Sequence, residues 1–97
     1  MSLHDEAQRG AQAADVLANP AYSEAYGLIE QEIINKWRES TDQETRERLH
    51  LSLKLLAMLH KALDSTMKSG QVAARELEIQ QSRLERIGAA FKRRSVA

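Results

Sequence analysis

The feature that most constrains the fold is a long apolar seam in the middle of the chain. Between Thr41 and Lys68 its positions recur at alternating steps of four and three residues, at Leu49, Leu53, Leu56, His60, Leu63 and Met67. This period gathers side chains on one face of an α-helix, whereas a half-buried strand would alternate at every second residue. Further apolar residues widen the face beside the seam, at Leu51, Leu55, Met58, Leu59 and Ala62. So broad a stripe predicts burial against a neighbouring helix and against another chain.

A second amphipathic helix is predicted just before this one. Asn19 and Pro20 form its start signal, because asparagine is a favoured N-cap and proline fits the first helical position. Its apolar stripe consists of Tyr22, Tyr26, Ile29, Ile33 and Trp37. Glu32 and Lys36 are four residues apart, in the order that favours an ion pair on the outer face of a helix.

The two helices are expected to form a long antiparallel hairpin over residues 20–69. Thr41 and Glu44 have the spacing of a capping box, so a new helix should begin there. The helices Pro20–Glu39 and Thr41–Lys68 would then be about 30 Å and 42 Å long, at ~1.5 Å per residue. The longer one must overhang, and its exposed leucines favour self-association.

Two further helical segments are predicted on either side of the hairpin. Residues 1–18 are expected to form a weakly ordered N-terminal segment with a short helix, because Gly10 interrupts a pattern built mostly of alanines. Gly70 is expected to end the long helix, since glycine is common just past a helix C-terminus. A C-terminal helix with a basic tail is then predicted over residues 71–94. Its seam consists of Leu77, Leu84 and Phe91, seven residues apart, with Ala73, Gln80 and Ile87 at the intermediate positions of the heptad pattern.

These elements predict an all-α protein that forms a single helical domain over residues 1–97 and assembles into a homo-oligomer. Ninety-seven residues suffice for one domain at most. The residues expected to form the oligomer or partner interface are Tyr22, Tyr26, Ile29, Ile33, Trp37, Leu49, Leu53, Leu56, His60, Leu63, Leu77, Leu84 and Phe91.

Composition excludes several classes of function. The chain has no cysteine, which excludes disulfides, thiolate catalysis and Cys-based zinc sites. It lacks the ~18 consecutive apolar residues of a membrane span, and its first residues do not read as a signal peptide. We therefore expect a protein that is neither secreted nor membrane-bound.

No catalytic template is met, so we expect no enzyme and no cofactor. The four glycines are isolated, which excludes a glycine-rich phosphate loop, and the serines lack a GxSxG context. One metal-like signal exists, because Glu47 and His50 have the E-x-x-H spacing of helical di-iron sites. A ferritin-like metal protein is the remote alternative. A solvated helix face explains the same residues more simply, so we assign no metal ligands.

Charge is distributed unevenly, although the formal net charge is zero. Residues 1–39 carry −4, and residues 71–97 carry +3. A solvated helix end explains this basic segment most simply. The alternative is a contact with nucleic acid or with an acidic protein surface, through Arg83, Arg86, Lys92, Arg93 and Arg94. Glu76, Glu78 and Glu85 dilute that charge, and no aromatic stacking platform accompanies it.

One segment carries a family resemblance. The run NPAYSEAYGLIEQEIINKWRES, followed by ETRERLHLSLKLLAMLHKAL and MKSGQVA, resembles a group of short helical proteins from tailed-phage and prophage genomes. Such proteins accompany genes for head assembly and DNA packaging. The resemblance covers about residues 19–74 and brings no catalytic residues.

The resemblance implies a non-enzymatic structural or assembly protein of the phage head or packaging apparatus. Such a protein would act by homo-oligomerisation and by contact with other head or packaging proteins. Its location would be the host cytoplasm during assembly, or the virion. The alternative is a packaging factor similar to small terminase subunits that contacts DNA through its basic C-terminus. The chain has no recognisable helix-turn-helix to support direct DNA recognition.

Overall fold

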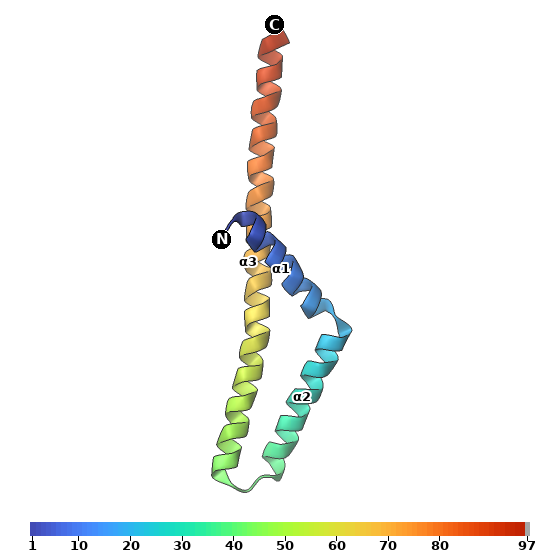
Figure 1. The fold of residues 1–97 in the computed structure, drawn as a ribbon, viewed down its shortest axis with the longest axis vertical. Coiled ribbons are helices and arrows are strands. Elements are labelled where there is room, and N and C mark those ends of the chain that lie inside the picture. Colours follow the sequence, from blue (N-terminus) through green and yellow to red (C-terminus); the bar gives the residue numbers. More distant parts are fainter. Residues whose placement is uncertain (97) are drawn as a thin grey trace.

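The computed structural model describes the backbone of residues 1–96 and the side chains of residues 1–93. Over that range the chain forms three helices and no strand: α1 (Leu3–Ala18), α2 (Pro20–Glu39) and α3 (Gln43–Val96). The first two run one after the other along one side of α3, which returns antiparallel to both (Figure 1). The predicted all-α class, with a helical hairpin, is confirmed.

The molecule is a rod rather than a globule. Its principal extents are 84 × 24 × 15 Å and its radius of gyration is 22.9 Å. A compact domain of this length would have a radius of gyration of about 13 Å. The length comes from α3 alone, because 54 residues of helix span about 81 Å at 1.5 Å per residue.

A single residue, Asn19, separates α1 from α2. Its backbone is extended (φ −73°, ψ 121°), because a residue before proline is excluded from the helical region. The Ala21 N–H donates to the Asn19 side chain at 2.8 Å, and the Asn19 N–H donates to the carbonyl of Val16 at 3.1 Å. Asn19 therefore ends one helix and caps the next, and the predicted start at Asn19 and Pro20 is confirmed.

The cap of α3 lies one residue later than predicted. The carboxylate of Asp42 accepts the backbone N–H of Thr45 at 3.0 Å and its hydroxyl at 2.7 Å, and α3 begins at Gln43. The capping box expected from Thr41 and Glu44 is wrong. An ionised carboxylate is a stronger acceptor than a threonine hydroxyl, so Asp42 takes the N-cap position.

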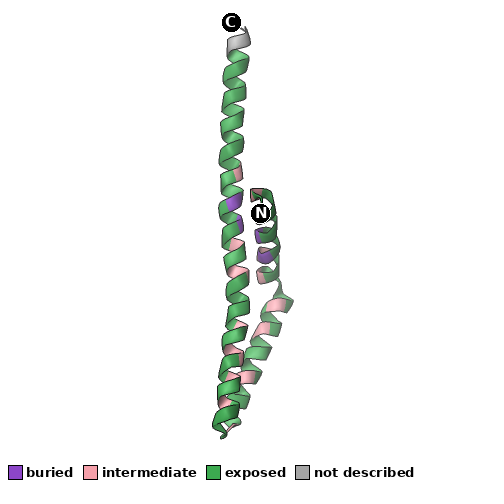
Figure 2. Cartoon of the chain, turned by 60° about the vertical axis from the view of Figure 1, so that its left-hand side comes forward, coloured by how far each residue is buried: buried purple, intermediate pink, exposed green. Residues whose placement is uncertain are grey.

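The two helices α1 and α3 cross in direct backbone contact at a pair of glycines. A Cβ added to Gly70 would overlap the Cα of Gly10 and lie 3.0 Å from the carbonyl oxygen of Glu6. Ala13 and Ala73 follow three residues later on the two helices. These two alanines and two glycines are the buried residues of the described chain (Figure 2). Only such small residues let two helix backbones approach this closely.

Two predictions about these glycines are wrong for the same physical reason. Gly70 does not end the long helix, and the helix expected over residues 71–94 is the C-terminal part of α3. Gly10 does not interrupt the N-terminal helix, which runs unbroken for 16 residues after its cap, Ser2. Glycine costs a helix interior about 1 kcal/mol relative to alanine. Close packing at the crossing offsets that cost, so the N-terminal segment docks on its own chain.

The C-terminal part of α3 extends past both other helices (Figure 1). Leu77 is the last partly covered residue, and every side chain from 78 to 93 is exposed (Figure 2). We call residues 78–93 the C-terminal overhang.

Replacing Gly70 by alanine should destabilise the protein, although alanine is the better helix former. Its Cβ would meet backbone that has no flexible end to move aside, and overpacking of this kind costs about 1–3 kcal/mol. Gly27→Ala is the matched control, because nothing lies within 4 Å of an added Cβ at Gly27. That variant should gain up to about 1 kcal/mol. Thermal unfolding followed by circular dichroism measures the stability of both variants. An equal rise in melting temperature for Gly70→Ala and Gly27→Ala would contradict the close contact at Gly70.

The cap of α3 should weaken in acid. Hydrogen bonds from the Thr45 hydroxyl and then from its backbone N–H lower the pKa of Asp42 below its usual 3.8. A lowered folded-state pKa means that the stabilisation is present above 3.8 and lost as the pH falls through the lowered pKa. Asp42→Ser should therefore melt earlier than the wild type at neutral pH, and the difference should shrink well below pH 3.8. Glu30→Gln is the control at neutral pH, because it removes an exposed carboxylate that caps no helix, and it should melt close to the wild type.

Candidate protein-protein interface

Most of the predicted interface residues lie between the helices of one chain. Eight are partly covered where α1 and α2 face α3: Tyr22, Tyr26, Ile33, Leu49, Leu53, Leu56, Leu63 and Leu77. Five are exposed: Ile29, Trp37, His60, Leu84 and Phe91. No large side chain among the described residues is fully buried. The inner face of the hairpin is therefore a thin, open layer rather than a core.

An aromatic cluster joins the start of α2 to the middle of α3. The hydroxyl of Tyr22 lies 3.4 Å from Nδ1 of His60, a distance at the long end of a hydrogen bond. The His60 ring centroid lies 5.5 Å from that of Tyr26 and 6.4 Å from that of Tyr22. The position of His60 on the seam predicts burial, but the residue is exposed. The ring sits at the open edge of the hairpin.

A second contact fastens the closed end of the hairpin. The guanidinium of Arg46 lies 3.8 Å from the centroid of the Trp37 ring and donates to the carbonyl of Ser40 at 3.0 Å. One side chain of α3 thus holds both the last turn of α2 and the loop that follows it. The tryptophan remains 39% exposed, so the contact leaves part of the ring open to solvent.

A continuous apolar face lies on α3 beside the side that meets α2. Leu51, Leu55, Met58 and Leu59 are each more than half exposed, at 56%, 64%, 63% and 52%. Their steps of four, three and one residues place them within about a third of the helix circumference. We call these four residues the outer stripe. Monomeric soluble proteins rarely leave contiguous apolar faces uncovered, so the outer stripe is a candidate contact with another chain.

The C-terminal overhang carries a second apolar face. Leu84, Ile87 and Phe91 are 69%, 65% and 74% exposed, at steps of three and four residues. No other described part of the chain reaches this segment (Figure 1). It is therefore the least covered apolar surface of the molecule.

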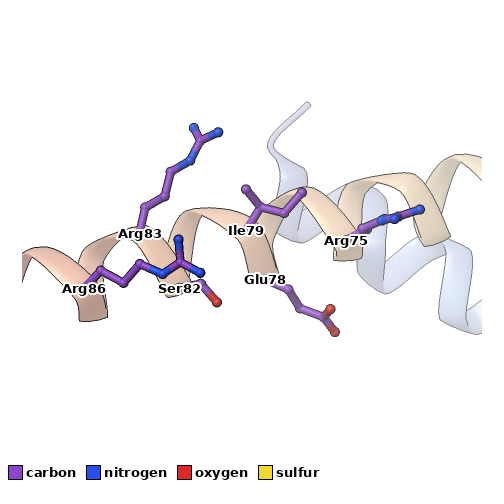
Figure 3. A pocket seen from close by; sticks show the side chains of 6 residues that line it. All are labelled: Arg75, Glu78, Ile79, Ser82, Arg83 and Arg86. Carbon is purple, nitrogen blue, oxygen red and sulfur yellow. The ribbon is translucent and has the colours of Figure 1, made fainter.

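A shallow depression on α3, where the overhang begins, is lined by three basic residues and one acidic residue. Arg75, Arg83 and Arg86 line it together with Glu78, and Arg83 and Glu78 point to opposite sides of the helix (Figure 3). Lys92 and Arg93 follow on the same exposed helix, and the side chain of Arg94 lies outside the described residues. This mixed charge along a single helix does not select nucleic acid over a protein surface.

Other kinds of site find little support in the described geometry. Across residues 1–93, no group of three or more His, Asp or Glu side chains lies close enough to hold a metal ion together. Glu47 and His50 are both exposed on α3, with no further metal-ligating side chain grouped with them in that range. Among the described helices, none combines the length and apolar character that crossing a membrane requires.

Comparisons with protein-family models, with curated proteins and with solved structures found no match to this chain.

The sequence identified the seams but not the full extent of the candidate surfaces. Leu28, Val72 and Ile79 were not among the predicted interface residues, yet all are exposed apolar side chains. Their helical positions, outside the seam that meets a neighbouring helix, were the available signal. An exposed position and a buried one use the same residue types here, so the pattern alone could not separate them.

Arg46→Lys should loosen the closed end of the hairpin. Lysine keeps the charge but loses the planar guanidinium that lies on Trp37 while donating to Ser40. We expect a loss of about 1 kcal/mol in unfolding free energy, together with a change in the emission of Trp37, the only tryptophan. Arg48→Lys is the control, because the Arg48–Glu44 ion pair is exposed. The unfolding free energy of Arg48→Lys should fall by no more than about 0.5 kcal/mol. Equal effects of the two variants would contradict a special role for Arg46.

Proposed function

We propose that the protein is a non-enzymatic structural or assembly component that acts by associating with further copies of itself and with other proteins. The observation that carries this proposal is the lack of a hydrophobic core. Ala13 and Ala73 are the only buried apolar side chains among the described residues. Two alanines contribute little against the conformational entropy that folding costs, so a stable fold needs apolar surface buried elsewhere.

The size of the accessible surface supports the same proposal. The chain exposes 7983 Å². A compact monomer of its mass would expose roughly 5,600 Å². The surplus of about 2,400 Å² is comparable with what one partner buries in a large obligate interface. This much uncovered surface favours association, in which other chains would bury part of it.

The outer stripe is the proposed contact on the hairpin. It is apolar, continuous and placed beside the inner face, so a second chain could cover it without displacing α1 or α2. Lys54 and Lys61 lie elsewhere on the same helix and keep one side of α3 polar. A helix with one polar side and two apolar faces is typical of helical assemblies.

The resemblance to short helical proteins of tailed phages supports a more specific proposal. The protein would work in head assembly or DNA packaging, in the host cytoplasm or in the virion. A ring similar to those of small terminase subunits is one form that such an assembly could take. The resemblance is carried by α2 and the first half of α3, the same elements that form the hairpin and the outer stripe.

Analytical ultracentrifugation over a range of concentrations tests the proposal. The wild-type chain should sediment as an oligomer of its 10.9 kDa subunit. The variant Leu55→Glu/Met58→Glu should sediment as a smaller species, because it places two charges on the outer stripe. Lys61→Glu, on the polar side of α3, should leave the oligomer intact. A wild-type chain that stays monomeric at every concentration would overturn the proposed function.

A further inference from the structure

The C-terminal overhang continues a coiled-coil seam that its own chain does not cover. Leu77, Gln80, Leu84, Ile87 and Phe91 recur at steps of three, four, three and four residues. This is the spacing with which helices pack side by side as knobs into holes. The neighbour that covers the earlier part of α3 buries Ala73, which is 1% exposed, and its cover ends at Leu77, the last partly covered residue. From residue 78 onward the described side chains have no neighbouring helix.

A second copy of the same segment is the occupant that fits this seam. Resting on the proposed self-association, we infer that two C-terminal overhangs pack against each other in antiparallel orientation. The three residues that the seam leaves most exposed are large and apolar, and the surplus surface of the chain is ample for such a pairing. The side chains of the seam can pack as knobs into holes against a second copy of the same seam, so the pairing needs no different kind of partner.

Charge decides the orientation. The last part of the overhang is basic, with Arg86, Lys92 and Arg93, and Arg94 follows them in the sequence. Its first part carries Glu78, Arg83 and Glu85, and therefore one net negative charge. A parallel pair would bring the two basic ends together, where like charges repel. An antiparallel pair places each basic end beside the acidic part of the other helix and also opposes the two helix dipoles.

The crossing of α1 decides the register. Ala73 is already covered, so a register that brings Phe91 of one copy over Ala73 of the other is blocked by α1. The next heptad places Leu84 of each copy against Ile87 of the other, and Phe91 against Gln80. In this arrangement Gln81 and Gly88, which flank the seam on one side, form the nearest pair of flanking positions in the two copies, offset by about 3 Å along the axis. An added Cβ at Gly88 would have no atom within 4 Å, so a second helix could approach the chain there.

Disulfide trapping tests orientation and register together. The chain contains no cysteine, so introduced cysteines have no background. In the variant Gln81→Cys/Gly88→Cys the two positions are about 10.5 Å apart along one helix. That exceeds the Cα separation of about 7 Å that a disulfide tolerates, so no bond forms within a chain. Under mild oxidation most of this variant should run at twice the subunit mass on a non-reducing gel. The single variants Gln81→Cys and Gly88→Cys should remain uncrosslinked.

Two controls separate the possible failures. Ser82→Cys/Ala89→Cys has the same spacing on the side of the helix away from the seam and should not crosslink. Phe91→Cys alone should crosslink only in a parallel pair, so its dimerisation would overturn the antiparallel inference.

Sedimentation of the same wild-type preparation completes the test. An oligomeric wild type whose Gln81→Cys/Gly88→Cys variant stays uncrosslinked would overturn this inference and leave the proposed function standing. A monomeric wild type would overturn both. Leu84→Glu should abolish the crosslink in the double-cysteine background, whereas Leu55→Glu should preserve it, because the outer stripe lies on a different part of α3.

Discussion

The contact between Gly10 and Gly70 is the interaction on which the rest of the architecture depends. It brings α1 against the middle of α3, and it contributes half of the buried residues of the described chain. With α1 fixed there, the extended backbone of Asn19 directs α2 back along α3. The aromatic cluster and the Arg46 contact with Trp37 then fasten α2 at its two ends. Everything past the crossing is left as a single helix.

The periodic parts of the fold could be predicted from sequence because each residue type there has one physical role. Asn19 before Pro20 sets a helix start, and the stripe through Tyr22 and Ile33 turns toward α3 as its period requires. Glycine is different, since it serves both as a helix stop and as a site of close helix contact. The choice between these roles at Gly70 depends on Gly10, sixty residues earlier, and no local pattern contains that pairing.

The candidate surfaces were predicted only in part for a related reason. Leucines on the inner seam and on the outer stripe have the same chemistry, and a helix with two apolar faces does not indicate which one its own chain will cover. The answer follows from where α1 and α2 lie, and hence from the crossing. The cap of α3 was also hard to predict from sequence, because several adjacent residues could have formed it. Ser40, Thr41 and Asp42 are adjacent candidates, and the strength of a carboxylate acceptor decides among them.

The unbroken course of α3 has a geometric consequence for any assembly built from this chain. The outer stripe and the overhang seam lie on one continuous helix, so their separation and their relative rotation are both set by residue number. About 32 residues separate Leu55 from Ile87, which corresponds to roughly 48 Å along the axis. Removing one residue between them would shorten that distance by only about 1.5 Å and rotate one surface relative to the other by about 100°. Neighbouring copies in such an assembly would then meet at a different dihedral angle, so its curvature would depend on the length of this segment more strictly than on its composition.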